Sequence, residues 1–441
     1  MQHYGAGKHL ITMMCLLGLL FLYAPVLMAQ DTLAVEGKVI DSKYGDAIPY
    51  AHVFISGSSL GTVSNDAGNF RLLIPGNMMS DSLTISSIGF APATFSIANV
   101  LAARQTSFTL TTDTRLLNEV VILPTDPFDL IQEAIDKIPE NYRTSPGKQQ
   151  VFYREMARTD TSYITFSEAV LEVYKAPYAV TDTSLKDQVK VLKGRSKVDE
   201  NQQQAIEESS GLALKGFSGG PYWALDLDLV RHPRLFYGDQ EEGRFRHFFH
   251  PESRKFYSYT FEGITSYRGK RAYVITFERD RNLTNKLLFK GKVIIDETSK
   301  AFVSIEYQLD KKSKNKIVPG GFATRALLRL FGIKYDLFDV SGKQTYRPYD
   351  GKWDLYYSKG NLKMYLKARR RKRNIDVNST FTLRQELLVT EQYEGKASPI
   401  PAVERLKKDE NITSRFNAYD PDFWKKYTIL ERESSTLESF D

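Results

Sequence analysis

The chain has 441 residues, of which 42% are hydrophobic and 26% are charged, a balance that excludes wholesale disorder, collagen and coiled coil. Its 60 Lys and Arg against 53 Asp and Glu give a formal net charge of +7, short of the dense basic clustering of a dedicated nucleic-acid-binding protein. The single cysteine, Cys15, excludes a disulfide framework and cysteine-based zinc sites.

The N-terminus has the pattern of a secretory signal peptide over residues 1–29. Residues 10–28 are almost wholly apolar, Lys8 precedes them, and Ala29 places a small residue at the exit. We therefore expect cleavage after Ala29 or Gln30 and an exported protein, either in the periplasm or on the periplasmic face of the outer membrane. The alternative is an uncleaved membrane anchor, because the apolar run reaches the length range of a spanning helix.

Residues 33–112 alternate between short apolar runs and turn-forming residues. This pattern is typical of an all-β sandwich, here of the seven-stranded type. The expected strands are Val35–Ile40, Ala51–Ile55, Asn69–Ile74, Ser82–Ile88, Thr94–Ile97 and Ser107–Leu110.

Four segments of this region resemble the carboxypeptidase-regulatory-like domain, which in Bacteroidetes often follows a signal peptide. They are Gly37–Asp41, Ile48–Val53, Gly61–Phe70 and Leu83–Phe90. In Asp66-x-Gly68-x-Phe70, the glycine is free to adopt a positive φ in a turn before an aromatic residue enters the core. The resemblance implies a transthyretin-like sandwich that binds or spaces, without a catalytic carboxypeptidase domain, and the sequence contains no His-x-x-Glu.

A linker and a helix are expected over residues 113–145. Apolar residues recur at helical spacing over Phe128–Ile138, with Asp126 as N-cap and Pro139 as the terminator. The stretch Ala134–Tyr178 resembles a family of uncharacterised Bacteroidetes envelope proteins, in which it commonly follows the regulatory-like domain.

Residues 146–395 predict a larger antiparallel β-rich domain, giving a mainly β, α+β chain overall. A polar excursion of loop or helix is expected near 182–243, and a charged C-terminal tail over 396–441 is expected to pack as a latch or to stay mobile. Hairpins around Lys290–Tyr307 resemble those of the curved half-barrel in bacterial lipoprotein carriers, so the sheet could enclose an apolar cavity or could simply cover its own core. The expected strands are Lys255–Phe261, Arg271–Phe277, Leu288–Asp296, Phe302–Leu309, Gly351–Tyr357, Asn361–Lys367 and Phe381–Thr390.

Two patterns resemble catalytic or metal sites. Gly57–Gly61 matches G-x-S-x-G, but a turn and another strand follow it, which favours a β-turn over a nucleophile elbow. His247, His250 and Glu252 are weak metal-ligand candidates, because Pro251 disfavours the helix that would bring the two imidazoles to one face. We therefore expect no catalytic residue, no metal and no cofactor.

The sharpest charge feature is a run of five basic residues, which are Arg369, Arg370, Arg371, Lys372 and Arg373. It is expected at a hairpin tip, where it could be merely solvated or could contact anionic headgroups or a protein partner. A second basic tip, Lys311–Lys316, would strengthen the anion interpretation if both lay on one rim. Phe322–Phe331 is amphipathic and could lie on a membrane surface or pack as a helix.

The sequence as a whole favours an exported, non-enzymatic envelope protein that acts as a binding or adaptor module. Its expected partners are an envelope protein or glycan, an outer-membrane component or an anionic headgroup, and no nucleic acid. The first alternative is a lipid or peptide carrier or sensor that uses a curved sheet. The second is a metal-dependent hydrolase.

Overall fold

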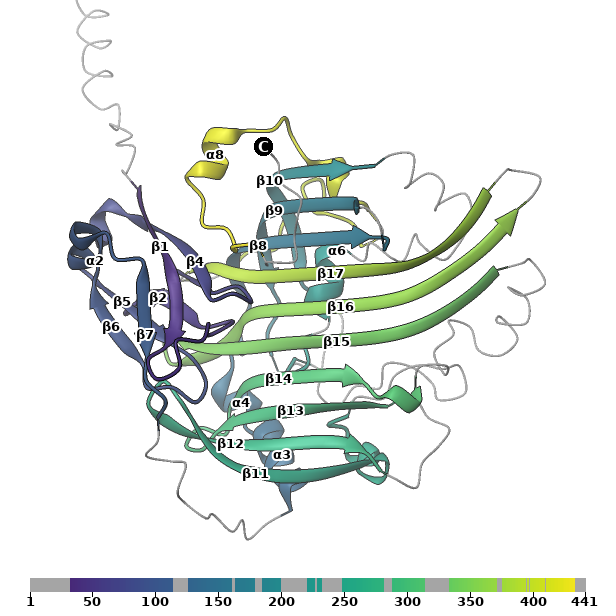
Figure 1. The fold of residues 1–441 in the computed structure, drawn as a ribbon, viewed down its shortest axis with the longest axis horizontal. Helices are drawn as coiled ribbons and strands as arrows, with labels where there is room; N and C mark the ends of the chain where they lie inside the picture. The colour runs from purple at the N-terminus through teal and green to yellow at the C-terminus, as the bar shows by residue number, and fades with distance from the viewer. Residues whose placement is uncertain are drawn as a thin grey trace, which may run out of the picture.

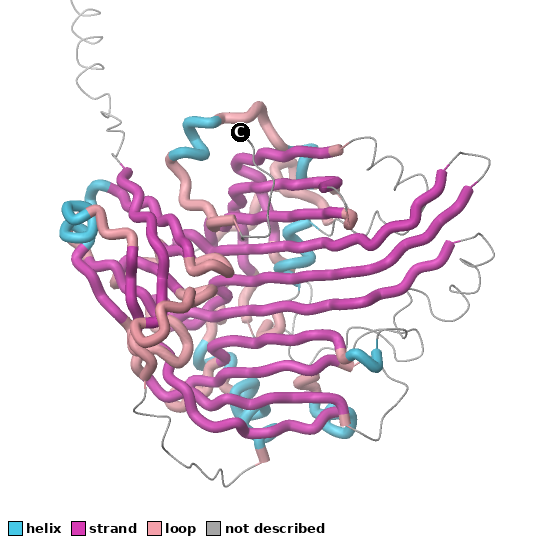
Figure 2. The backbone as a smooth tube through the Cα atoms, viewed as in Figure 1, coloured by secondary structure: helices cyan, strands magenta, loops and turns pink. Residues whose placement is uncertain are grey.

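The structure, a computed structural model, describes residues 32–113, 126–160, 163–178, 185–199, 220–226, 228–231, 248–280, 288–313, 333–370, 375–393, 395, 397–408 and 410–432. The expected signal peptide, His247, Arg371–Arg373 and the amphipathic stretch Phe322–Phe331 lie outside these ranges. In the part described, no helix is long and apolar enough to cross a membrane. The chain is mainly β, and its helices are few and short (Figure 2).

The N-terminal unit is a sandwich of seven strands in two sheets, as predicted. One sheet has the order β4-β1-β7 and the other the order β3-β2-β5-β6. Its core contains Val39, Phe70, Ile85 and Phe108. The strands are β1 (Thr32–Asp41), β2 (His52–Ile55), β3 (Gly61–Val63), β4 (Asn69–Pro75), β5 (Ser82–Ser86), β6 (Ala93–Ser96) and β7 (Ser107–Leu110), with the short helices η1 (Gly76–Met78) and α2 (Ile97–Ala103).

The turn before β4 has the glycine with a positive φ that the sequence predicts. Gly68 has φ +81°, and a Cβ there would lie 2.6 Å from the carbonyl oxygen of Val39. Two residues later Phe70 is almost fully buried. Helix α2, by contrast, was not expected, because Ile97 was assigned to the end of a strand.

The second unit is one open sheet of ten antiparallel strands in the order β10-β9-β8-β17-β16-β15-β14-β13-β12-β11. The chain lays β8 to β10 at one end, crosses to β11 at the far end, and returns until β17 pairs with β8 (Figure 1). The strands are β8 (Gly147–Arg158), β9 (Tyr163–Lys175), β10 (Gln188–Val198), β11 (Tyr257–Tyr267), β12 (Lys270–Arg279), β13 (Phe289–Asp296), β14 (Phe302–Leu309), β15 (Ile333–Tyr349), β16 (Lys352–Arg370) and β17 (Ile375–Tyr393).

Two expectations for this sheet differ in part from the structure. The excursion expected near 182–243 contains β10, whose alternating Lys190, Lys193 and Arg195 look like a polar loop but belong to a charged edge strand. The two strands expected over 351–367 are one strand, β16. Gly360 resembles a turn residue, yet it pairs with Gly342 on one side and Gln385 on the other, so the ladder continues through it.

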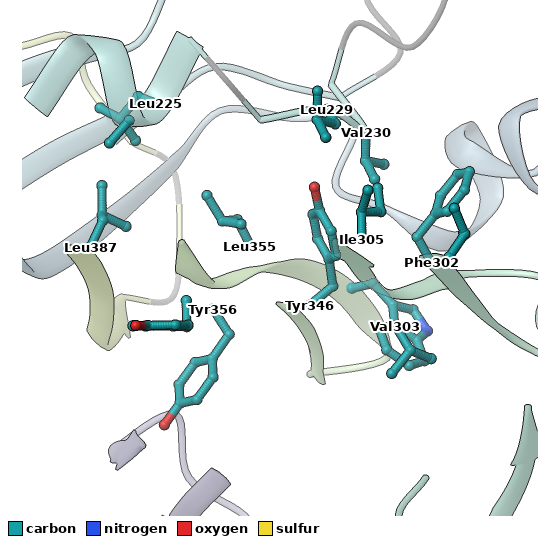
Figure 3. Close-up of a cluster of buried hydrophobic side chains, with 14 of the residues drawn as sticks. Leu225, Leu229, Val230, Phe302, Val303, Ile305, Tyr346, Leu355, Tyr356 and Leu387 are labelled. Carbon is teal, nitrogen blue, oxygen red and sulfur yellow. The ribbon is translucent and has the colours of Figure 1, made fainter. Parts of the chain in front are cut away.

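One face of the sheet is apolar and covered. Behind the sheet in Figure 1 lie α3 (Pro127–Asp136), α4 (Ile138–Asn141) and α6 (Gly220–Asp226). Leu225, Leu229 and Val230 meet Ile305, Leu355 and Leu387 of the sheet in a continuous buried cluster (Figure 3). Among the residues described, side chains fill this layer.

The helix over 128–138 forms with the predicted cap. The Asp126 carboxylate accepts a hydrogen bond from the Phe128 N–H at 2.8 Å, and the buried residues of α3 face the sheet. Pro139 does not terminate α3, which ends at Asp136. It lies instead in the first turn of α4, where a backbone N–H has no partner within the helix, so the N–H that proline lacks is not missed.

The C-terminal segment packs as a strap along one end of the sheet. It includes η6 (Ile412–Arg415) and α8 (Pro421–Lys425). Ile400, Leu406, Ile412, Trp424 and Leu430 are buried. Of the two alternatives predicted for this tail, its described part, residues 397–408 and 410–432, forms a latch.

Candidate functional site

The sandwich is bonded directly to the large sheet. Tyr356 Oη donates to the Thr62 carbonyl at 3.0 Å, the Gln392 N–H donates to Ser59 Oγ at 3.0 Å, and the Gly89 N–H donates to the Ser266 carbonyl at 2.8 Å. In Figure 3, Tyr356 points away from the apolar cluster toward a strand of the sandwich. The two units therefore form one frame with a fixed junction.

Beside this junction the face of the sheet opposite α3, α4 and α6 forms an open groove of about 760 Å³, with Tyr50 of the sandwich as its wall. Side chains alternate between the two faces of a strand, so Lys292 and Glu306 point into the groove, while their neighbours Val293 and Ile305 are buried in the core. The charged residues that line it are Glu262, Glu278, Lys290, Lys292, Glu306, Lys343 and Lys359.

Charges in the groove are partly paired. Lys343 Nζ lies 2.9 Å from Glu306 Oε1. Burial favours the neutral acid, but Lys343 and then Lys292 outweigh it, and the pKa of Glu306 is lowered. Four lysines face three glutamates, so the groove has a small positive excess together with neutral hydrogen-bonding groups such as Gln308 and Asn361.

Tyr50 is fixed by several contacts. Its ring stacks on Tyr357 with 5.8 Å between centroids. Lys359 Nζ donates to its hydroxyl at 2.8 Å, and Lys343 Nζ lies 5.2 Å from the ring centroid. Tyr50 also has φ +56°, a conformation that is unfavourable for a bulky residue and is often retained at functional positions.

At its inner end the groove leads into a pocket of about 200 Å³ under the sandwich. His52 lies there, with Nε2 3.1 Å from Thr345 Oγ1 and Nδ1 3.3 Å from Tyr267 Oη. Burial lowers the pKa of His52 well below its usual value, and Arg347, Arg268 and Lys343 lower it further. The imidazole is therefore neutral, and it serves as a hydrogen-bonding group of the junction rather than as a cation.

A buried charge cluster lies on the same face, beneath the strap. Arg154 Nη2 lies 2.7 Å from Glu168 Oε1, and Arg154 Nη1 lies 3.3 Å from Glu386 Oε2. Arg195 also contacts Glu168 at 2.5 Å. Two cations thus balance two anions. The cluster is covered by Leu430 and shows no access for a substrate, so its geometry fits a structural role.

The opposite face holds a second buried network around Asp228. This carboxylate accepts from Lys175, Tyr178 and Tyr346, each at 2.9 Å. Burial would raise its pKa, but Lys175 and the two hydroxyls reverse the effect, and the pKa of Asp228 is lowered. Fully hydrogen-bonded buried ions of this kind hold elements together. Here they join β9, β15 and the segment after α6.

The candidate metal ligands do not come together in the described part of the chain. His250 is the N-cap of η3 (Pro251–Phe256), and its Nδ1 accepts from the Glu252 N–H at 3.1 Å. No group of three His, Cys, Asp or Glu residues there could hold a metal ion. His247 lies outside the described residues. Gly57–Gly61 joins β2 to β3, so it is the turn that was expected rather than a strand-to-helix elbow.

The structure describes only the first two residues of the basic run, and Arg371–Arg373 lie outside the described residues. Arg369 and Arg370 end β16 and pair with Asp376 and Ile375 of β17. Lys311 and Lys312 follow β14. Strands β14 and β16 run in the same direction, since each is antiparallel to β15, so both basic segments lie toward the same end of the sheet. Strand β16 continues well past β14, because Gln308 is level with Asn361 through Ser341.

Residues 35–122 match the family model of the CarboxypepD_reg-like domain, so the N-terminal unit is such a domain, with no carboxypeptidase catalytic domain evident. No curated protein matches the sequence. The solved structures that resemble the chain include the following three, each with a low TM-score. One is a domain assigned to outer membrane lipoprotein sorting in Vibrio parahaemolyticus, with 9% identity over 60% of this chain and 91% of that chain and a TM-score of 0.23. Another is a LolA superfamily protein from Nitrosomonas europaea, with 11% identity over 63% of this chain and 97% of that chain and a TM-score of 0.19. The third is MucB in complex with MucA(peri), with 10% identity over 62% of this chain and 100% of that chain and a TM-score of 0.18.

Sequence reasoning missed the groove. Its residues come two or three at a time from β11 to β16 and from Tyr50 in the sandwich, and no local spacing links them. The available signal was the alternation of charged and apolar residues in Phe289–Asp296 and Phe302–Leu309, which marks one open polar face.

Proposed function

We propose that this chain is an exported envelope protein that binds a polar polymer without transforming it, and that the ligand is a glycan lying in the groove beside Tyr50. The observation that carries this proposal is the groove itself. It combines one fixed aromatic wall with a floor of lysine, glutamate, amide and hydroxyl side chains on a rigid sheet.

The chemistry of the floor favours a glycan over a protein surface. Protein hot spots usually center on buried aromatic or apolar anchors. The groove instead presents hydrogen-bonding groups such as Gln308, Ser341 and Asn361. Sugar hydroxyls can donate to and accept from such groups, and the face of a sugar ring can pack on an aromatic side chain such as Tyr50.

The covered face of the sheet gives less support to the carrier alternative. Such a carrier needs an apolar cavity of several hundred Å³. Where the structure describes the layer between the sheet and α3, α4 and α6, it is filled by buried residues such as Tyr346, Leu355 and Leu387. An apolar ligand would have to displace them.

The basic residues at one end of the sheet favour one orientation of the protein on a membrane surface. Lys311 and Lys312 lie toward the same end of the sheet as the end of β16, while the sandwich lies at the other end (Figure 1). An end with several cations attracts anionic headgroups. Contact between this end and a membrane surface would leave the groove open to the periplasm.

Binding of the purified protein to a panel of soluble bacterial envelope polysaccharides, measured by biolayer interferometry, tests the proposal. Lys292→Glu changes the floor of the groove, and Lys38→Glu makes the same change on the exposed face of β1 as a matched control. We expect at least one polysaccharide to bind saturably and Lys292→Glu to weaken it about tenfold, a loss typical of one charge-assisted contact.

Three results would overturn this proposal. Equal affinities for the wild type and Lys292→Glu would remove the groove as the binding surface. Shortening of the bound polysaccharide during incubation would show that the protein is an enzyme. If no polysaccharide binds while a photo-crosslinker at position 292 captures a single envelope protein, the ligand is a protein and not a glycan.

A further inference from the structure

A second pocket lies at the junction, outside the groove, where three turns meet. Its volume is about 240 Å³, and Arg268, Arg347, Asp350, Ser58 and Phe54 line it. The turns join β2 to β3, β11 to β12 and β15 to β16. The last two are two-residue hairpin loops in which both residues have positive φ, as in type I′ turns. Such turns are rigid, so the pocket is preformed.

Arg347 is a buried cation without a carboxylate partner among the described residues. It is 4% exposed, and its Nη2 donates to the Ser59 carbonyl at 2.6 Å and the Ser58 carbonyl at 3.4 Å. Its Nη1 has no hydrogen-bond partner. A buried charge is normally paired, because leaving an ion unpaired away from water is costly.

Arg268 adds a second guanidinium to the same pocket. The guanidinium carbons of Arg268 and Arg347 each lie 4.9 Å from the centroid of Phe54. Arg268 also has φ +52°, at a turn position where Asn, Asp or Gly is usual. A positive φ is unfavourable for arginine, so its presence at this position favours a functional role for the side chain.

The pocket has a net positive charge. Two guanidiniums face one lining carboxylate, Asp350, and within the described ranges no carboxylate lies at ion-pair distance from either arginine. The Gly57–Gly61 turn contributes the two carbonyls that hold the Arg347 fork in place. The volume exceeds the ~30 Å³ that one water occupies in the liquid, so a tetrahedral oxyanion fits.

We propose that Arg268 and Arg347 bind a phosphate group in this pocket. Arginine forks match the oxygen geometry of phosphate and form short, charge-assisted hydrogen bonds with it. The group could come from free phosphate or from a phosphorylated headgroup, since both present the same oxygens. This site is separate from the groove and does not rest on the function proposed for it.

Isothermal titration of the purified protein with inorganic phosphate, at constant ionic strength in chloride, tests the site. Arg268→Gln removes one guanidinium from a half-exposed position, and Lys270→Gln makes the same charge change on the same hairpin outside this pocket. We expect Arg268→Gln to weaken phosphate binding about tenfold and Lys270→Gln to leave it within about twofold.

The variant Asp350→Asn should strengthen phosphate binding, whereas Arg268→Gln should weaken it. Asn suits the positive φ of this turn residue, so the hairpin is preserved while the one lining carboxylate is neutralised. We expect phosphate to bind several-fold more tightly, because repulsion from Asp350 is removed. A purely structural role of the two arginines would not produce this gain.

Vesicles of phosphatidylcholine with and without phosphatidic acid identify the source of the phosphate. Sedimentation that needs phosphatidic acid and is lost in Arg268→Gln assigns the group to a headgroup, whereas titration by inorganic phosphate without vesicle binding assigns it to a soluble phosphate. The proposal fails if neither probe binds, if acetate binds as well as phosphate, or if Arg268→Gln and Lys270→Gln behave alike.

Discussion

Arg154 donates from Nη2 to the carbonyl of Leu430 at 2.6 Å, and this contact ties the C-terminal strap to the center of β8. The same guanidinium is bonded to Glu168 and Glu386 beneath the strap. The strap continues to the sandwich, where Thr428 Oγ1 accepts from the Leu73 N–H at 3.1 Å. One side chain therefore links the two halves of the molecule through the last residues described.

Replacement of Arg154 should destabilise the protein severely. Arg154→Met removes the shared cation and leaves Glu168 and Glu386 without it in a buried site, which costs about 3–5 kcal/mol. Arg254→Met is the matched control, because its ion pair with Asp126 is exposed and such pairs contribute about 0–1 kcal/mol. Urea unfolding of both variants measures the difference. Similar losses of unfolding free energy in the two variants would show that the Arg154 cluster does not stabilise the fold more than an exposed ion pair does.

Loss of packing under the strap should be measurable separately from loss of charge. Leu430 is 3% exposed, whereas Val403 is 82% exposed. Leu430→Ala should cost about 2–5 kcal/mol, while Val403→Ala should stay within about 0.5 kcal/mol. Limited proteolysis of the native protein would show the consequence, since a loosened strap is cut sooner. An unchanged rate would contradict a strap held by this residue.

Stability should fall as the pH drops below neutrality because of His52. Its pKa is lowered in the folded protein, so between that pKa and the unfolded value of about 6.5 the unfolded chain binds more protons. The free energy of unfolding therefore rises with pH in this window, and acidification below about pH 6.5 removes roughly 1.4 kcal/mol per pH unit. His52→Gln should flatten this dependence between pH 5 and 7.5. An unaltered slope in His52→Gln would show that His52 is not the group responsible.

Two glycines allow the energetic cost of a steric clash to be measured separately from the cost of a positive φ in a residue with a side chain. Gly45 and Gly68 both have positive φ, at +72° and +81°. Nothing lies within 4 Å of a Cβ at Gly45, whereas one at Gly68 meets the Val39 carbonyl. Gly45→Ala should cost about 1 kcal/mol, and Gly68→Ala about 1–3 kcal/mol more. Equal thermal shifts in calorimetry would argue against the close approach at Gly68.

Local patterns were enough to predict the sandwich but not all of the sheet. Residues 33–112 have period-2 alternation and clear turn residues, and each strand expected there is present. In β8 the neighbours Arg154 and Glu155 are both buried, Arg154 toward the strap and Glu155 toward Gln385, which bonds to α6. In β9 the neighbours Ser167 and Glu168 are both buried as well. Buried polar residues on both faces erase the alternation, so these strands gave no usable signal.

The sites depend on contacts between distant parts of the sequence. The basic run at Arg369–Arg373 was visible because its residues are adjacent. Arg268 and Arg347, by contrast, become a pair only after two hairpins meet the β2–β3 turn. Each is ordinary alone, and the lack of a carboxylate partner among the described residues becomes visible only in three dimensions.

The position of β17 has a consequence for how the protein is made. Strand β8 is among the first strands of the large sheet to be synthesised, yet one of its two neighbours is β17, which ends at Tyr393. Until that residue is available, β8 keeps an open edge that could pair with another chain. Formation of the sheet must therefore wait for nearly the whole polypeptide, which predicts slow assembly and a need for protection of the early strands on the way.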